Sequence, residues 1–412
     1  MSALFGYGDS SNGLDAYFTL PFVVLVHASS DSSPTENNGC VSYNQAENTI
    51  VISCDDIRLT DIDREINDPL VLVRNYNGEE GVWFLNANVV INKDSTFVID
   101  PQDTKWLKIS AGGDDAHSIQ VFGSLKIDSV KVTSWNPEIN DYTKFRLDNM
   151  PENDADEFSE VNRIPRPYIV VDEANGSTNI TNSEIAYLGY DCSSGRCHGL
   201  AFYGDSGKPN IIRANNIHHN NFGYYSNNTG AAILEDNHVH HNYVYGFDPH
   251  TDSHDLVIRN NTVHDNGSIG IICSLDCFNI TIENNIVHNN TKAGVMLSRL
   301  TYNSVVRNNT ISDENAGISI SESYNNKIYN NTVFDIMNGI ELKANSYDNV
   351  VQDNKIERPL NHGIRISGNT TGNTLESNSV IDILDHARAF SVAKELANVN
   401  IVKENEILDL TF

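Results

Sequence analysis

A glycine followed by a short apolar strand recurs through the second half of this chain, each time 22 to 24 residues after the last. A fixed period in this range is typical of a solenoid, in which each repeat forms one rung and stacks on its neighbours. The repeat therefore predicts a stacked architecture for this part of the chain. The recurring glycines are Gly199, Gly223, Gly246, Gly270, Gly294, Gly317, Gly339 and Gly363.

An asparagine recurs in phase with the glycines. Identical amides stacked at a turn can hydrogen-bond along the axis of a β array. Almost no segment shows helical periodicity, so we predict an all-β fold, a right-handed parallel β-helix with rungs of 22–24 residues and an irregular N-terminal cap. The expected ladder is Asn216, Asn237, Asn261, Asn285, Asn309, Asn331, Asn354 and Asn378.

Side chains alternate between the two faces of each strand. The first and third residues after each glycine are predicted to face inward, and the second and fourth to face outward. The inward pairs include Leu200/Phe202, Ile271/Cys273, Val295/Leu297, Ile318/Ile320, Ile340/Leu342 and Ile364/Ile366. The outward pairs include Tyr225/Asn227, Ile272/Ser274, Met296/Ser298, Ser319/Ser321, Glu341/Lys343 and Arg365/Ser367.

One rung departs from this pattern. After Gly246 the outward pair is Asp248 and His250, and Pro249 takes an inward position. Proline removes a donor from the strand ladder and is unusual inside a sheet. The pattern predicts a carboxylate and an imidazole side by side on an exposed sheet face. An isolated aspartate–histidine pair of this kind is most often a solvated group on the protein surface. Because rungs lie about 4.8 Å apart, close to the length of a sugar residue, an outward column can also contact a polysaccharide unit by unit.

The charge balance excludes some classes of partner. The 412 residues include 27 basic and 55 acidic side chains, a net charge of −28. Nucleic-acid binding needs a basic surface and is not expected. The longest apolar run, Phe18 to Val26, is too short to span a membrane. Residues 1–33 lack the basic flank of a signal peptide, and an atypical or trimmed leader there stays open.

Six cysteines fall into three local pairs, Cys40/Cys54, Cys192/Cys197 and Cys273/Cys277. Local pairs suit short disulfide loops in an oxidising compartment, so we predict an extracellular, periplasmic or cell-surface location. Cys273 is alternatively a core thiol, since it falls on an inward position. No CxxC or His-rich metal spacing is recognised, so no metal is expected. Calcium is left open as a cofactor, although no calcium-binding motif occurs.

The chain divides into a cap or appended region, residues 1–81, and a β-helix, residues 82–412, with the strict repeat over about 199–376. Early strands are expected at 82–85, 89–91, 96–99, 106–109, 119–122 and 129–133. The polar and acidic stretch 136–166 is predicted to be a long loop.

Several segments resemble the mannuronan C-5-epimerases, and most closely the periplasmic bacterial type. The most specific is VYGFDPHTDSHDLVIRNNTVHDN at 244–266. EIAYLGYDCSSGRCHGLAF (184–202), NNFGYYSNN (220–228), LKIDSVKVTSWN (125–136), AGVMLSRLTYNS (293–304) and NHGIRIS (361–367) also fit. The resemblance covers roughly 82–370. It implies conversion of mannuronate to guluronate in alginate, an anionic polysaccharide, by a monomeric protein.

The resemblance also implies roles. His250 is the base or acid at carbon 5 and Tyr245 its partner on the opposite face, while Asp248 orients the uronate carboxylate or shares a proton with it. The chain departs from the family at Leu275, where the bacterial enzymes carry an arginine. Arg299 is the expected replacement cation, and Lys292 is the rival.

Further substrate contacts are expected on the same outward column. These are Tyr203, Tyr225, Asn227, Lys343 and Arg365. Each has an ordinary alternative as packing or as a solvated surface group.

The sequence therefore predicts an isomerase, a mannuronan C-5-epimerase. Two alternatives stay open: a lyase that uses the same proton abstraction and then eliminates the 4-linked sugar, and a non-catalytic carbohydrate-binding β-helix of a cell surface.

Overall fold

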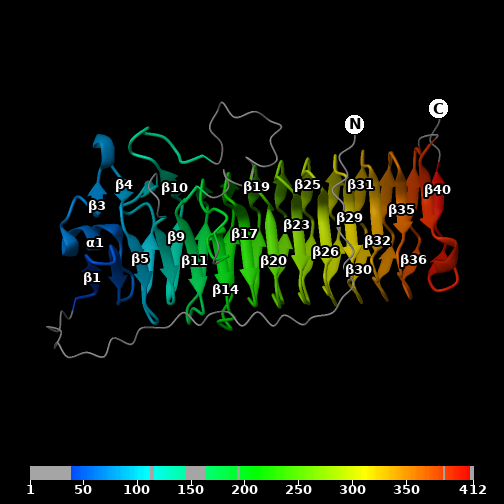
Figure 1. Ribbon diagram of the computed structural model, residues 1–412, viewed down its shortest axis with the longest axis horizontal. Helices are drawn as coiled ribbons and strands as arrows, with labels where there is room; N and C mark the ends of the chain where they lie inside the picture. Colours follow the sequence, from blue (N-terminus) through cyan, green and yellow to red (C-terminus); the bar gives the residue numbers. More distant parts are fainter. Residues whose placement is uncertain (1–38, 112–115, 145–163, 193–194, 384–385, 409–412) are drawn as a thin grey trace. The chain divides into compact units, whose positions relative to one another are not determined.

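A computed structural model describes residues 39–111, 116–144, 164–192, 195–383 and 386–408. The part from Gly39 onward forms one compact unit. It is a right-handed parallel β-helix whose strands form three sheets and follow one another in rung order along the stack (Figure 1). The predicted fold class is confirmed. The 1–33 segment discussed above and most of the predicted 136–166 loop lie outside the described residues.

The first sheet, called here the β20 sheet, has 14 strands. All its pairings are parallel except that of β1 with β2. Its strands are β1 (Val41–Asn44), β2 (Thr49–Ile52), β5 (Asn88–Ile91), β8 (Ser118–Val121), β11 (Tyr168–Asp172), β14 (Gly199–Tyr203), β17 (Phe222–Asn227), β20 (Phe247–His250), β23 (Ile269–Ser274), β26 (Ala293–Ser298), β29 (Ala316–Ser321), β32 (Asn338–Lys343), β35 (His362–Ile366) and β38 (Arg388–Val392).

The second sheet, the β21 sheet, follows the first along each rung and has 12 strands. They are β6 (Thr96–Ile99), β9 (Ser124–Asp128), β12 (Thr178–Thr181), β15 (Asn210–Arg213), β18 (Ala232–Glu235), β21 (Val257–Arg259), β24 (Thr281–Glu283), β27 (Val305–Arg307), β30 (Lys327–Tyr329), β33 (Val350–Gln352), β36 (Thr374–Glu376) and β39 (Ile401–Lys403).

The third sheet, the β22 sheet, completes each rung and has 14 strands, with an antiparallel pairing at β3 and β4. They are β3 (Leu72–Arg74), β4 (Val82–Leu85), β7 (Trp106–Ser110), β10 (Lys131–Trp135), β13 (Glu184–Ala186), β16 (Asn216–His218), β19 (His238–His240), β22 (Thr262–His264), β25 (Ile286–His288), β28 (Thr310–Ser312), β31 (Thr332–Phe334), β34 (Lys355–Glu357), β37 (Ser379–Ile381) and β40 (Glu406–Leu408).

The helical elements are α1 (Leu59–Ile66) and the short 3-10 helices η1 (Tyr76–Gly78) and η2 (Lys394–Leu396). Leu59 and Ile62 of α1 are fully buried against the first rungs, where a solenoid would otherwise expose its core. β2 already pairs in parallel with β5, so the parallel part of the β20 sheet begins at Thr49. Within the described residues, no helix is long and apolar enough to cross a membrane.

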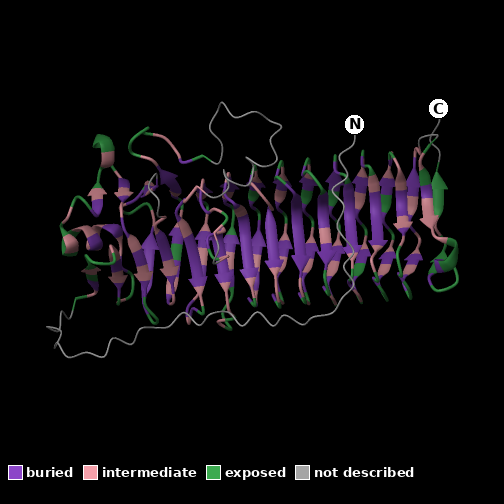
Figure 2. Cartoon of the chain, viewed as in Figure 1, coloured by how far each residue is buried: buried purple, intermediate pink, exposed green. Residues whose placement is uncertain are grey.

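The predicted inward residues form the core. Ile271, Cys273, Ile318, Ile320 and the other inward pairs are at most 1% exposed and belong to one continuous cluster. Figure 2 shows buried residues along the strands from one end of the stack to the other. The glycine column has a steric cause: a Cβ on Gly246 would lie 2.5 Å from the backbone oxygen of Gly270 in the next rung.

The prediction that outward residues are exposed is wrong for part of the β20 sheet. Ile272, Ser274 and Ser319 are 4%, 0% and 1% exposed, and Asp248 is 2% exposed. Each outward side chain has neighbours on both sides only about 4.8 Å away. Short side chains are therefore covered by longer ones in adjoining rungs.

The asparagine ladder begins at Asn215, and the prediction of Asn216 is wrong by one residue. In each step the Oδ1 atom of one asparagine accepts the backbone N–H and the Nδ2 group of the asparagine one rung before it, as from Asn261 to Asn285 at 2.9 Å for both bonds. The ladder continues to Asn405. Two further ladders were not predicted. They are Asn220–Asn242–Asn266–Asn290, ending on Glu314, and Asn326–Asn349–Asn373–Asn400.

Two of the three predicted disulfides are present, Cys40–Cys54 and Cys192–Cys197. For the third pair a core thiol at Cys273 was the open alternative, and Cys273 and Cys277 are indeed buried free thiols. Cys273 faces the core, as its inward position requires. The Cys277 thiol instead donates to the backbone oxygen of Ser274 at 3.2 Å.

Candidate functional site

The Asp248–His250 segment lies in the middle of the β20 sheet. Asp248 is opposite Tyr225 on β17, and His250 is opposite Asn227 on β17 and Ser274 on β23. Between β20 and β23 only two residue pairs are in register, Phe247 with Ile271 and His250 with Ser274. The interruption falls at Pro249, whose nitrogen has no hydrogen to donate. Proline therefore loosens the ladder beside the two polar residues.

Asp248 is buried, and its Oδ1 atom has no hydrogen-bond partner among the described residues. Burial raises the pKa of this carboxyl well above its ordinary value, and the positive charge of Arg299 opposes that shift only in part. Burial therefore favours the protonated form of the carboxyl, and in that form it can donate a hydrogen bond to an anion.

His250 is half-buried, with its Nδ1 atom 2.8 Å from Thr251 Oγ1 and 3.5 Å from the Tyr225 hydroxyl. Burial, and secondarily the charge of Arg299, lowers the pKa of this imidazole to about 4. The ring is therefore neutral at physiological pH. In the tautomer whose Nδ1–H donates to Thr251 Oγ1, the Nε2 atom carries the lone pair that a general base requires.

Arg299 is the cation that the structure brings toward this pair. It follows β26, two rungs from β20, in a left-handed backbone conformation with φ of 48°. Its Nη2 group donates to Ser274 Oγ at 3.2 Å, so the side chain reaches back one rung toward His250. Among the described residues Arg299 has no carboxylate partner.

Lys292 lies elsewhere. It immediately precedes β26, whereas Arg299 immediately follows it, and the six-residue strand between them spans about 20 Å. Lys292 is exposed and lies at the same end of the β20 sheet as Tyr245. The structure therefore separates the two cations that the sequence treats as rivals.

Tyr245 precedes β20 and is half-buried. Its ring meets Phe222 edge-on at 5.4 Å between centroids. It also packs on a small apolar patch on the outer side of the sheet, formed by Ile269, Ile272, Ala293, Ala316 and Met296. His250 is five positions after Tyr245, about 16 Å along an extended strand. The two side chains therefore flank a surface of about that length.

Tyr225 and Tyr203 extend the site toward β14, with ring centroids 5.7 Å apart. Burial raises the pKa of the Tyr225 phenol, which stays protonated. The Tyr203 ring is covered by the Arg196 guanidinium, 4.5 Å from its centroid, and its hydroxyl donates to the Gly195 carbonyl at 2.5 Å. The loop closed by the Cys192–Cys197 disulfide thus holds Tyr203 in place.

Lys343 and Arg365 lie on β32 and β35, four and five rungs from β20. Both contact the carboxylate of Glu341, at 3.3 Å and 3.7 Å. Their charges are shared with Glu341, so they are less available to a ligand than that of Arg299.

His198 belongs with these residues, although it was not among the predicted site residues. Its ring lies 4.3 Å from that of Tyr225, and burial, then the nearby His250, lowers its pKa to about 4. Its Nδ1 atom is buried without a partner among the described residues. The sequence feature that could have identified His198 is its position directly before Gly199, at the start of the first regular rung.

Comparisons with known proteins agree with this architecture. The family model described as "Right handed beta helix region" matches residues 161–300 and 272–393. Together the matches span more than half of the chain, which therefore belongs to the right-handed β-helix family.

Solved structures are similar over most of the chain. The periplasmic alginate epimerase AlgG is 21% identical, with a TM-score of 0.73, covering 88% of this chain and 85% of that one. The A-module of the Azotobacter vinelandii mannuronan C-5 epimerase AlgE4 is 13% identical, with a TM-score of 0.53, covering 80% and 89%. The Dettilon tailspike protein is 16% identical, with a TM-score of 0.51, covering 86% and 70%. No curated protein sequence matches significantly. At these identities the likeness establishes the fold.

Proposed function

We propose that this protein is a mannuronan C-5-epimerase acting on alginate-like polyuronates. One observation carries the proposal: three groups share one stretch of the β20 sheet, the buried Asp248 carboxyl with its raised pKa, the neutral His250 imidazole, and the Arg299 guanidinium, which has no carboxylate partner among the described residues. An anionic sugar acid that loses a carbon-bound proton needs these three kinds of group. The fold shared with two epimerases is consistent with the proposal.

The reaction begins at carbon 5 of mannuronate. The neutral imidazole of His250 takes the proton, and the electron pair of the C–H bond moves into the adjacent carboxylate. That group then carries a second negative charge. A hydrogen bond from the Asp248 carboxyl and the charge of Arg299 stabilise it. The negative carboxylate also raises the pKa of the His250 imidazole once substrate binds, which strengthens the base.

The second half of the reaction returns a proton to carbon 5 from the opposite face. The Tyr225 hydroxyl is next to His250 and therefore on the side of the base. Tyr245, at the other end of β20, is the proposed donor to the other face. Reprotonation there inverts carbon 5 and yields guluronate.

The net charge of −28 generally disfavours binding of a polyanionic substrate. Arg299 supplies local compensation because it has no carboxylate partner among the described residues. Asp248 contributes because burial disfavours its negative charge. Lys292, Lys343, Arg365 and Asn227 are proposed to contact neighbouring uronates along the sheet. Two disulfides support a periplasmic or extracellular location.

The test is incubation of the full chain with polymannuronate in D2O, followed by proton NMR. The expected result is guluronate with deuterium at carbon 5 and no unsaturated chain ends. Unsaturated ends would instead identify a lyase. Binding of polymannuronate with neither product would identify a carbohydrate-binding protein.

The matched variants are His250→Asn and His362→Asn, since both residues lie half-buried on the β20 sheet. His250→Asn should abolish guluronate formation, and His362→Asn should keep it. Both should melt close to the wild-type temperature, because neither side chain belongs to the core. Full activity of folded His250→Asn would exclude this residue as the base.

A further inference from the structure

Half of the chain's 14 histidines lie on the outer face of the β22 sheet and at the corner that follows it. The strand register places His218, His240, His264 and His288 in one column. Their rings stack at 5.0, 5.2 and 4.7 Å between centroids. The other members of this cluster are His219, His238 and His241. This face is distinct from that of the proposed epimerase site.

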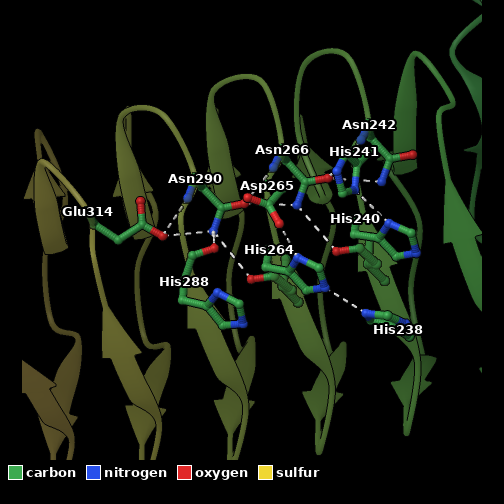
Figure 3. Close-up of polar contacts among 12 residues, drawn as sticks. His238, His240, His241, Asn242, His264, Asp265, Asn266, His288, Asn290 and Glu314 are labelled. Carbon is green, nitrogen blue, oxygen red and sulfur yellow. Dashed lines mark hydrogen bonds and ion pairs between the residues drawn. The ribbon is translucent and has the colours of Figure 1, made fainter.

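Stacking by itself only indicates a packed column of rings, but the nitrogen atoms also converge. His238 Nε2 and His264 Nε2 are 2.6 Å apart, and His240 Nδ1 and His241 Nδ1 are 2.8 Å apart. Two ring nitrogens at that distance hold one proton between them, so in each contact one nitrogen donates and the other accepts through its lone pair. Figure 3 shows these rings gathered from adjacent rungs, with the Asp265 carboxylate directed at His264.

Three ligand atoms come close together at the corner. His241 and Asp265 take the same position after β19 and β22, one rung apart, and both have left-handed backbone with φ of 53°. His264 Nδ1 lies 2.6 Å from Asp265 Oδ2. One ligand atom each from His241, His264 and Asp265 lies within 4.8 Å of the others. Tetrahedral zinc places its ligand atoms about 3.4 Å apart. Since His241 and Asp265 are exposed, small side-chain rotations close that difference.

We propose that His241, His264 and Asp265 form a binding site for a divalent transition-metal ion of the zinc class, separate from the epimerase site. Imidazole with one carboxylate selects zinc, nickel or copper over calcium and magnesium. The expectation of no metal rests on spacing along the chain. Here the ligands come from two rungs, 24 residues apart, and stacking brings them together. A bound ion would link these rungs at the corner that leads into the β20 sheet.

The test uses tag-free full-length protein, stripped with a chelator and titrated with zinc alone by calorimetry. We expect one equivalent to bind, cobalt to give the visible spectrum of a tetrahedral site, and zinc to raise the melting temperature. His241→Gln and Asp265→Asn alter exposed side chains and should fold. Each should weaken zinc binding at least tenfold.

His264→Cys should retain binding because thiolate is a zinc ligand, whereas His264→Gln should lose it. His362→Gln, on a different sheet, is the matched control and should bind zinc as the wild type does. The proposal is overturned if wild type binds no zinc, or if His241→Gln and Asp265→Asn bind it unchanged. A loss of binding in His362→Gln equal to that in the ligand variants would also overturn it.

Discussion

The asparagine ladder allows a quantitative prediction for Asn285→Ala. The Asn285 side chain is 1% exposed and makes four hydrogen bonds. Its Oδ1 atom accepts from the backbone N–H and the Nδ2 group of Asn261. Its Nδ2 group donates to the Ile258 carbonyl at 2.9 Å and to Asn309 Oδ1 at 3.0 Å. Alanine removes all four.

The magnitude follows from what is left behind. The buried N–H of Asn261 loses its acceptor, which costs about 1–3 kcal/mol, and the three other bonds contribute about 0.5–1.5 kcal/mol each. Asn285→Ala should therefore lower the free energy of unfolding by roughly 3–7 kcal/mol. The control is Asn369→Ala, since Asn369 is exposed, and its effect should stay within about 0.5 kcal/mol.

The assay is equilibrium urea unfolding, monitored by circular dichroism. The two variants are compared by their urea midpoints, which report stability when the m-values are the same. Hydrogen exchange would show whether the rungs of Asn261 and Asn309 open locally before the rest. If Asn285→Ala unfolds at the same urea concentration as Asn369→Ala, the ladder bonds do not stabilise the solenoid and the reasoning fails.

Other predictions concern the core and the proposed epimerase site. Ile320→Asp places an unpaired charge in the core and should destabilise by more than about 3 kcal/mol, whereas Ser321→Asp at the outer strand end should be nearly neutral in urea unfolding. Arg299→Ala should lower turnover on polymannuronate more than tenfold; turnover within twofold of wild type would exclude it as the cation. In wild type, kcat/KM should fall only as the pH drops through about 4, where the His250 imidazole takes up a proton. Arg299→Ala removes a positive charge that disfavours the imidazolium form, so the pKa of His250 should rise and the fall in kcat/KM should begin at higher pH. Leu275→Arg should be tolerated and raise turnover, and a folded variant with reduced turnover would contradict a need for positive charge there.

The periodicity was sufficient to predict the fold. Ile271, Ile318 and Ile340 occupy the core because a side chain one residue past each glycine must point inward in a parallel stack. The ladder was misassigned at its first member because Asn215 and Asn216 are adjacent and both fit the period. Only the hydrogen bond from the Asn215 backbone to Asn237 distinguishes them.

The candidate site was less predictable. Alternation assigns Asp248 to the outer face, but it cannot show that neighbouring rungs cover that face and change the protonation of the carboxyl. His198 was missed because its contact with Tyr225 joins two different rungs. The convergence of His241, His264 and Asp265 likewise depends on the distance between rungs, which the order of residues along the chain does not contain.

The ladder that runs from Asn215 to Asn405 also determines where this chain can change length. Successive members are 22, 24, 24, 24, 22, 23, 24 and 27 residues apart, yet every step keeps the same hydrogen bond. Extra residues are therefore accommodated between the asparagines, while the asparagine position restores the register once in each rung. Insertions in the corner loops should therefore be tolerated, and the lengths of these loops should vary among proteins related to this one. An insertion within a strand would turn every following side chain to the opposite face until the next asparagine.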